Sequence, residues 1–244
     1  MKGIGREFIE KTKYHNMDRS DQVAGVEQPP LEQDFDTGGN IIKLPIPDEL
    51  VTEKINLREL IENRRSVRKY SKKALTSEEL SYLLWCTQGI KETIGRSATI
   101  RTVPSAGARH AIETYLLVNN VEGIKPGLYT YAAGKHSLVQ LDTDGNVSEM
   151  VIAGCLGQGF IGMSAVTFIW TTVIYRMTWR YGERGYRYIH LDAGHICQNL
   201  YLAAESIGCG ACAIAAFSDD EVNRILGIDG ERQFVLYLAT VGKK

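Results

Sequence analysis

The stretch "GLYTYAAGKHSLVQL", residues 127–141, decides the fold class. Two runs rich in Tyr, Thr, Val and Leu flank a short "AGK" segment, and Gly134 and Lys135 lie where the chain would turn back. This pattern predicts a β-hairpin, and a hairpin joins antiparallel strands. The stretch therefore argues against a doubly wound parallel sheet, in which helices must connect the strands.

The remaining elements are of mixed type. Strands are predicted at 113–120, 165–175 and 233–242, and helices at 57–64, 80–88, about 149–160, about 185–207 and 219–226. Helices and strands do not alternate regularly along the chain. The sequence therefore predicts an α+β domain with a mostly antiparallel central sheet flanked by helices.

Two of these helices carry a start signal of the form Ser/Thr-x-x-Glu. Thr76 with Glu79, and Ser218 with Glu221, have the spacing of a capping box. In each case a glycine follows the apolar stretch and is expected to end the helix.

Residues 1–47 differ in character from residues 48–244, which are predicted to form a single domain. The first segment is polar, and "EQPP", "DTGGN" and "LPIP" are turn or extended-chain signals. Disorder and an ordered arm that lies over another surface both fit this composition. Apolar residues favour an extended N-terminal arm with something to bury: Phe8, Tyr14, Phe35, Ile41 and Ile42.

The bulk composition is that of a soluble globular protein. The 28 basic and 29 acidic residues nearly balance, which argues against a general nucleic-acid or membrane surface. The N-terminus lacks the apolar core of a signal peptide, and the most apolar stretch, 165–174, is shorter than the ~20 residues that span a bilayer. Five cysteines without framework spacing fit a reducing compartment, so a cytoplasmic location is expected.

Several motifs have better structural than catalytic explanations. "GCLGQGFIG" (154–162) has the wrong spacing for a dinucleotide loop, and a helix packed through its glycines is expected instead. "CGAC" (209–212) matches C-x-x-C but follows a long helix, so small buried residues lining a turn are expected. The five histidines lack ligand spacing, and no G-x-S-x-G stretch occurs, so neither a metal site nor a serine hydrolase is predicted.

The stretch "RRSVRKYSKK" (64–73) holds six cations in ten positions. A solvated turn, a nucleic-acid patch and a seat for a phosphorylated cofactor all fit this stretch alone, although no second basic patch supports nucleic acid. Arg64, Ser66 and Arg68 alternate, so in extended chain they are expected on one side. Two guanidinium groups with a hydroxyl between them suit a phosphate and a planar ring that carries carbonyl groups.

Three blocks in order along the chain resemble the FMN-dependent nitroreductase superfamily: "RRSVRKY" (64–70), "PSAGARH" (104–110) and "QNLYLAAESIGCGACAI" (198–214). The resemblance covers residues 56–244. "RYGERGYRYIHLDAGHICQNLYLAA" (180–204) and "GREFIEKTKYH" (5–15) are similar to the branch that includes the streptolysin-type peptide dehydrogenases and azoline oxidases.

The resemblance implies a nitroreductase-like fold and a homodimer with two FMN sites at the subunit interface. It places Arg64 and Ser66 on the phosphate and ribityl chain, with Arg65 as a helper, and Arg68 at the N1/O2 edge of the flavin. Lys243 or Lys244 would also meet the phosphate. Two stretches would present backbone to the ring: Pro104, Ser105, Ala106 and Gly107, and Gly208, Cys209, Gly210 and Ala211.

One position departs from the branch. Azoline oxidases carry a Lys-Tyr pair credited with proton abstraction, where this chain has Arg180-Tyr181. Arginine stays charged and cannot act as that base, although Tyr181 could assist. The stretch "RMTWRYGERGYR" (176–187) is predicted to be a loop that places Arg180 in a lid over the flavin.

The function expected from the resemblance is an oxidoreductase that passes electrons from NAD(P)H through FMN to a small organic acceptor. Two alternatives remain open. One is a peptide dehydrogenase of the azoline type, which would need a partner to present its peptide. The other is a non-enzymatic flavin-binding protein.

Overall fold

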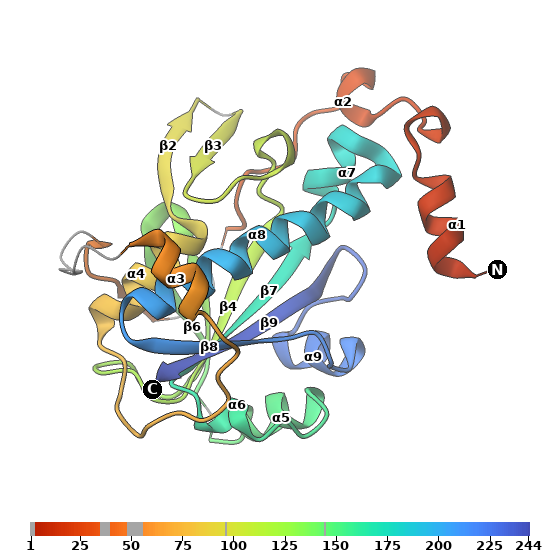
Figure 1. Cartoon of the computed structure of the whole chain (residues 1–244). Helices are drawn as coiled ribbons and strands as arrows, with labels where there is room; N and C mark the ends of the chain where they lie inside the picture. The colour runs from red at the N-terminus through yellow and green to blue at the C-terminus, as the bar shows by residue number, and fades with distance from the viewer. Residues whose placement is uncertain (1–2, 35–39, 48–55, 96, 144) are drawn as a thin grey trace.

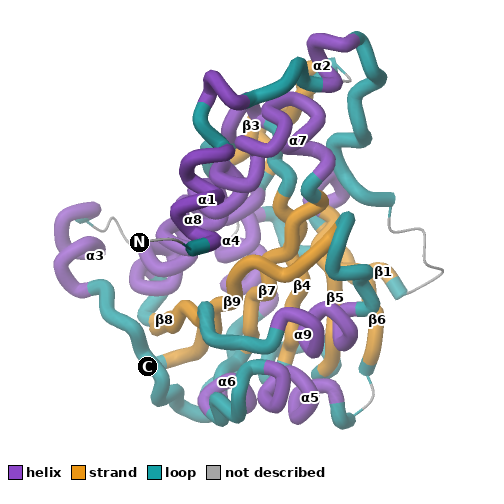
Figure 2. The backbone as a smooth tube through the Cα atoms, turned by 90° about the vertical axis from the view of Figure 1, so that its right-hand side faces the viewer, coloured by secondary structure: helices purple, strands orange, loops and turns teal. Residues whose placement is uncertain are grey.

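The computed structural model describes residues 3–34, 40–47, 56–95, 97–143 and 145–244. At its centre lies a seven-stranded sheet in the order β1-β6-β5-β4-β7-β9-β8, in which every neighbouring pair is antiparallel (Figure 1 and Figure 2). Its strands are β1 (Ile41–Lys43), β4 (Ile112–Val118), β5 (Gly127–Ala132), β6 (Ser137–Asp142), β7 (Val166–Val173), β8 (Cys209–Ile214) and β9 (Gln233–Lys243). A separate hairpin pairs β2 (Ile90–Ile94) with β3 (Ala98–Arg101). The predicted mostly antiparallel α+β fold is confirmed.

Helices cover both faces of the sheet (Figure 2). The described helices are α1 (Ile4–Lys11), α2 (Asp21–Ala24), α3 (Leu57–Asn63), α4 (Ser77–Gln88), α5 (Val147–Gly154), α6 (Phe160–Met163), α7 (Tyr175–Tyr181), α8 (Gly185–Ser206) and α9 (Asp219–Leu226), with short 3₁₀ turns η1 (Tyr14–Asn16), η3 (Ala106–Ala108), η4 (Ala133–Lys135) and η5 (Gly182–Arg184). Helices α4 and α8 pack on one face, and α5, α6 and α9 pack on the other.

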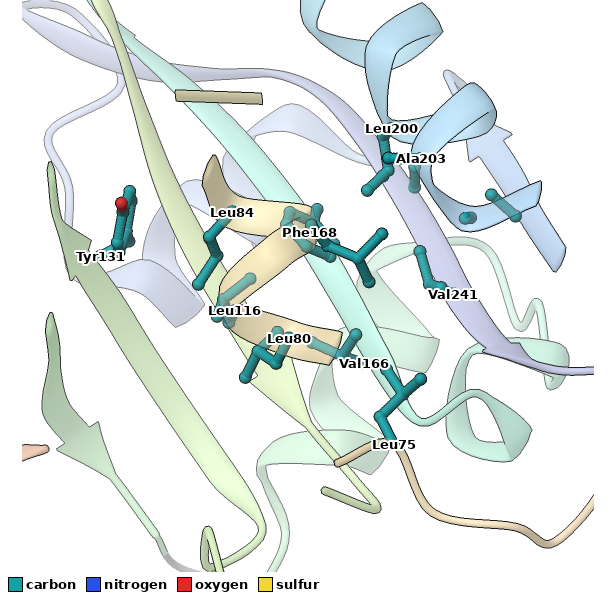
Figure 3. Close-up of a cluster of buried hydrophobic side chains, with 14 of the residues drawn as sticks. Leu75, Leu80, Leu84, Leu116, Tyr131, Val166, Phe168, Leu200, Ala203 and Val241 are labelled. Carbon is teal, nitrogen blue, oxygen red and sulfur yellow. The ribbon is translucent and has the colours of Figure 1, made fainter. Parts of the chain in front are cut away.

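The larger apolar core lies between the sheet and the α4–α8 pair (Figure 3). Leu80 and Leu84 of α4 and Leu200 of α8 meet Leu116 and Phe168 of the central strands, and all five are fully buried. Because this core fixes α4 and α8 on the sheet, it sets the positions of the loops and side chains that these helices carry.

Several local predictions are confirmed. The 127–141 hairpin forms, and its turn, η4, includes Gly134 and Lys135. Thr76 and Glu79 form the predicted capping box at the start of α4. The long helix begins at Gly185 as expected.

Other local predictions are wrong. The helix expected at 149–160 is two helices, because Leu156 and Gly157 adopt left-handed conformations between α5 and α6. Ser218 makes no side-chain cap, and three acidic residues in the first turn of α9 supply favourable charge there instead. The "CGAC" residues form strand β8 rather than a turn, since they pair with β9 from Cys209 onward.

The stretch 176–187 is helical rather than a loop, because it falls within α7, η5 and the start of α8. Arg176 and Trp179 are buried, and each donates a hydrogen bond to an arm carbonyl, Arg176 to Pro30 at 2.9 Å and Trp179 to Val26 at 3.0 Å. These long-range contacts hold α7 against the N-terminal arm.

The N-terminal arm contains α1, η1, α2 and β1 (Figure 1). Ile41 and Ile42 join the central sheet through pairing of β1 with β6. Phe8 and Tyr14 remain 36% and 68% exposed, so this chain alone does not bury them. Phe35 and the domain boundary at residue 48 lie outside the described residues.

Within the described residues, no helix combines the length and apolar character needed to cross a membrane.

Candidate functional site

The basic segment after α3 runs along the outer side of β8. Ser66 forms a parallel bridge with Ala211, and the Val67 N–H donates to the Ala211 carbonyl at 2.9 Å. The Val67 side chain fills the space that a β-carbon on Gly210 would occupy. Glycine at position 210 therefore lets the basic segment lie directly against the strand.

Tyr201 of α8 connects this segment to the helix. Its hydroxyl lies 3.0 Å from Ser66 Oγ and accepts a hydrogen bond from the Ala213 N–H at 2.8 Å. The Arg64 guanidinium lies 5.3 Å from the centre of its ring. The motif analysis missed Tyr201, although it stands inside the "QNLYLAA" block.

The Arg68 side chain does not lie on the same side of the sheet as Arg64 and Ser66. Its guanidinium lies 5.8 Å from the ring of Phe160 in α6, which covers the other face of the sheet. The expectation that three alternating residues share one side is therefore wrong for Arg68, because the segment leaves β8 after Val67 and reaches the end of β9 at Ser71. Among the described residues, neither these two arginines nor Arg65 forms an ion pair with a carboxylate.

The two terminal lysines already have partners. Lys243 pairs with Glu79, which also belongs to the capping box of α4, and Lys244 pairs with Glu205 at 2.6 Å. Their predicted contact with a phosphate stays a prediction.

Most residues of the predicted second wall, Gly208–Ala211, are buried in the hydrophobic core. Gly208 is exposed and left-handed (φ +67°), whereas Cys209 and Ala211 are buried in the main cluster. Burial raises the pKa of the Cys209 thiol to about 11, so it stays protonated at neutral pH.

The loop after Pro104 adopts an unusual backbone conformation. Gly107, Ala108 and His110 all have positive φ, at 58°, 53° and 42°. For residues other than glycine such conformations cost about 1–3 kcal/mol each and persist only where the surroundings enforce them. Strain of this kind clusters at functional sites.

Asp192 of α8 is hydrogen-bonded to the start of this loop. Ser105 Oγ donates to Asp192 Oδ2 at 2.6 Å, and the Ala106 N–H donates to Oδ1 at 3.3 Å. Burial raises the pKa of this carboxyl, and the two hydrogen bonds partly offset the effect. Asp192 also escaped the motif analysis.

The predicted pair Arg180-Tyr181 lies over the same loop. A β-carbon on Gly107 would overlap the Tyr181 hydroxyl and would lie 3.0 Å from Arg180 Nε. The structure therefore brings Arg180, Tyr181 and the 104–107 stretch together, as a group on one side of α8.

Tyr181 is supported in turn by Tyr188. Their rings meet edge to face with centres 4.9 Å apart, and Tyr188 Oη accepts from Arg184 Nε at 2.8 Å. Arg184 also donates to the Thr12 carbonyl at 2.7 Å and lies over the Tyr14 ring. The arm thus reaches the neighbourhood of Tyr181.

The two groups of site residues lie on opposite faces of α8. Asp192 and Tyr201 are nine residues apart, which is two and a half helical turns, or about 14 Å along the axis. Among the described residues, no hydrogen bond or ion pair joins the 64–68 segment to the loop 104–107 or to Arg180 and Tyr181. Within one copy of the chain, the two groups are therefore separated by the width of α8 and about 14 Å along its axis.

A model of the nitroreductase family matches residues 61–243, three quarters of the chain and both groups of the site. The chain belongs to the nitroreductase family. It is accordingly a flavin oxidoreductase of the nitroreductase type, and the expected resemblance is confirmed.

Two curated relatives agree with this assignment. A provisionally named nitroreductase of Methanocaldococcus jannaschii is 37% identical over 206 residues, which cover 84% of this chain and 98% of the relative. The trifolitoxin-processing protein TfxB of Rhizobium leguminosarum bv. trifolii is 31% identical over 133 residues, which cover 53% of this chain and 36% of TfxB.

Solved structures share the fold. A provisionally named nitroreductase from Anabaena variabilis is 32% identical with a TM-score of 0.68, covering 84% of this chain and 42% of that one. A chain of the Escherichia coli microcin synthetase McbBCD complex with truncated pro-MccB17 bound gives a TM-score of 0.62 at 18% identity. The match covers 100% of this chain and 98% of that one. The structure of an FMN complex from Desulfovibrio desulfuricans gives a TM-score of 0.54 at 16% identity. The match covers 78% of this chain and 87% of that one.

Proposed function

We propose that this flavin oxidoreductase uses FMN and NAD(P)H to reduce a small organic acceptor, and that it works as a homodimer. The observation that carries the proposal is the separation of the two groups by α8. A phosphate-binding end and a ring-facing end on opposite faces of one helix would form one site if a second copy supplied one of them.

The basic segment suits the phosphate end. Arg64 and Ser66 converge on Tyr201, and Arg64 has no carboxylate partner among the described residues. Guanidinium groups bind phosphate through paired N–H donors, so an unpaired arginine beside a hydroxyl is chemically apt. Arg65 is exposed beside them and can assist.

The 104–107 loop suits the ring end. Because Gly107 lacks a β-carbon, Tyr181 and Arg180 can lie directly against its backbone, which places both side chains at the proposed ring end. The wall at Gly208 and the N1/O2 contact of Arg68 remain proposals, and the latter requires Arg68 to leave Phe160.

FMN, when bound, supplies the hydride and electron chemistry. The residues of this chain would then bind and orient the flavin and the acceptor and shield them from water. Arg180 presents a permanent charge above the loop and would attract an anionic acceptor, whereas the Tyr181 hydroxyl can donate a hydrogen bond to a reacting oxygen or nitrogen. Tyr188 holds the Tyr181 ring in place.

The test is the absorbance spectrum of the purified protein, followed by stopped-flow mixing with NADH and with NADPH. We expect flavin bands near one FMN per chain and their bleaching by at least one nicotinamide. A colourless protein that takes up no added FMN would refute the cofactor, and a bound flavin that neither nucleotide reduces would favour a flavin-binding protein without turnover.

A second candidate is oxidation of azoline rings in a peptide, and the similarity to TfxB is the observation that favours it. Arg180 stands against it, because arginine cannot abstract the proton. Arg180→Lys should therefore create or raise azoline oxidation if the site is otherwise competent. No product from the wild type or from this variant would exclude the candidate.

A further inference from the structure

Asp192 is a buried carboxylate without an ion-pair partner among the described residues, although His195, about one turn further along α8, acts to lower its pKa. Only 4% of the residue is exposed, and no Lys, Arg or His among the described residues forms an ion pair with it. Burying an unpaired carboxylate is unfavourable unless hydrogen bonds satisfy its oxygens. The two hydrogen bonds that it accepts both come from the start of one loop, from Ser105 and Ala106.

These hydrogen bonds continue through the loop. Ser105 Oγ donates its proton to Asp192 and also accepts the His110 N–H at 3.0 Å. The serine hydroxyl therefore joins the carboxylate to the far end of the loop. The segment between these two attachments contains all three left-handed residues, Gly107, Ala108 and His110.

The same segment supports the residues above it. Gly107 contacts Tyr181 and Arg180, and Arg109 donates from Nε to the Gly107 carbonyl at 3.1 Å while its guanidinium lies 5.5 Å from the ring centre of Trp179. A loop that relaxed toward ordinary φ values would lose this fit to α7.

We infer that Asp192 is a positioning residue that holds loop 105–110 in its left-handed conformation beneath Arg180 and Tyr181. It acts through Ser105 and Ala106 and contacts neither of the two residues above the loop. The consequence for flavin binding rests on the proposed function, whereas the consequence for the loop does not.

The experiment compares Asp192→Ala with Asp192→Asn in the full-length protein. Asparagine keeps an oxygen that can accept the Ala106 N–H and an amide that can donate to Ser105 Oγ, so it should rescue a positioning role. Ser105→Ala, which breaks the link to His110, is the second route to the same loop. Asp229→Ala is the matched control, because Asp229 Oδ1 accepts three backbone N–H groups in a different loop, at 2.9–3.0 Å.

The first readout needs no flavin. Tryptic cleavage after Arg109, followed by mass spectrometry of the native protein, reports whether the loop has opened. We expect Asp192→Ala to be cleaved there about tenfold faster or more, which corresponds to losing hydrogen bonds to a charged group. Ser105→Ala should also accelerate cleavage, whereas Asp192→Asn and Asp229→Ala should stay within about threefold of wild type.

The second readout is FMN affinity. We expect the dissociation constant for FMN to be roughly tenfold larger in Asp192→Ala and to return to the wild-type value in Asp192→Asn. Unchanged cleavage after Arg109 in both Asp192→Ala and Ser105→Ala would overturn the inference. Cleavage as fast in Asp192→Asn as in Asp192→Ala would overturn it too, since charge rather than hydrogen bonding would then be responsible. If the wild type binds no FMN, the proposed function fails, and the cleavage result still decides the role of Asp192.

Discussion

Glu32 of the N-terminal arm forms an ion pair with Arg101 of β3 at 3.1 Å, and the Arg101 side chain is only 2% exposed. Arg101 also donates to Gln88 at 3.0 Å, and Glu32 accepts the Gly134 N–H at 3.1 Å. The arm therefore supplies the charge that balances a buried arginine of the body.

Removing that charge should destabilise the fold. We expect Glu32→Ala to lower the free energy of unfolding by about 3 kcal/mol, because it leaves a buried guanidinium unpaired. Urea denaturation monitored by circular dichroism measures the effect. Glu10→Ala, which removes an exposed partner of Lys13 from the same arm, should leave the midpoint unchanged. Equal midpoints for the two variants would contradict this account.

Gly107→Ala should impair the site beyond its backbone strain. An alanine in the left-handed region costs about 1–2 kcal/mol, and at this position its β-carbon would also displace the Tyr181 hydroxyl. Gly25→Ala is the matched control, since Gly25 is also left-handed (φ +84°) but has open space around it. We expect both variants to lose stability and only Gly107→Ala to lose turnover. Wild-type turnover in Gly107→Ala would show that contact with Tyr181 is dispensable.

The arginines of the basic segment should differ in their effects. Arg64→Ala should increase FMN dissociation because it removes a cation from the phosphate, and the difference from wild type should shrink at high salt, where screening weakens the contact that Arg64 makes. Arg68→Ala should lower the two-electron flavin potential by about 30–65 mV if its charge-assisted hydrogen bond forms mainly to reduced flavin. Lys69→Ala, which removes an exposed cation of the same segment, is the control and should change both quantities little. A potential unmoved by Arg68→Ala would leave this arginine beside Phe160, where the structure has it.

Mixing two defective variants tests whether the flavin site is shared. Arg64→Ala damages one face of α8 and Gly107→Ala the other, so a mixed dimer should contain one intact and one doubly damaged site. After denaturation and joint refolding of equal amounts, we expect about a quarter of the wild-type FMN sites to return. No recovery above the separately refolded variants, with mixed dimers shown by mass spectrometry, would place the whole site within one chain.

Acid should destabilise the protein through His110. Burial, followed by the positive charge of Arg101, lowers the pKa of His110 to about 3, whereas an unfolded histidine has a pKa near 6.5. The unfolded chain therefore binds the additional proton between these values, so stability is complete above pH 6.5 and declines as the pH falls. At pH 5 the loss through this group is about 2 kcal/mol.

His110→Asn should reduce that loss, and asparagine tolerates the left-handed backbone at this position. The measurement is the difference in unfolding free energy between pH 7.5 and pH 5 for the two proteins. An unchanged difference would mean that His110 is not the group that titrates.

Local signals predicted the elements whose partners lie nearby in the sequence. The 127–141 hairpin and the Thr76–Glu79 capping box depend on neighbours within a few residues, and both formed. Strand β8 was missed because "CGACAI" is built from small residues and gains its strand character from pairing with β9.

Helix α7 was missed for a related reason. Its arginine-rich sequence, followed by Gly182, is typical of a loop, and its anchors are the arm carbonyls of Val26 and Pro30, which are 153 and 146 residues away. Within the candidate site, the family motifs pointed to Arg64, Ser66 and Gly107, whose roles stay predictions, but not to Asp192 or Tyr201. The helical period of α8 predicts that those two residues lie on opposite faces of the helix. It does not predict which loops they contact, because those loops are distant in the sequence.

The basic segment also matters for solubility. At one edge of the sheet, the Val67 N–H donates to the Ala211 carbonyl of β8 at 2.9 Å. At the other end, β1 is only three residues long and ends at Lys43. Unpaired strand edges invite other chains to add to a sheet, and short or charged edges prevent this. With one edge overlaid by a cationic segment and the other cut short, the sheet offers little template for aggregation.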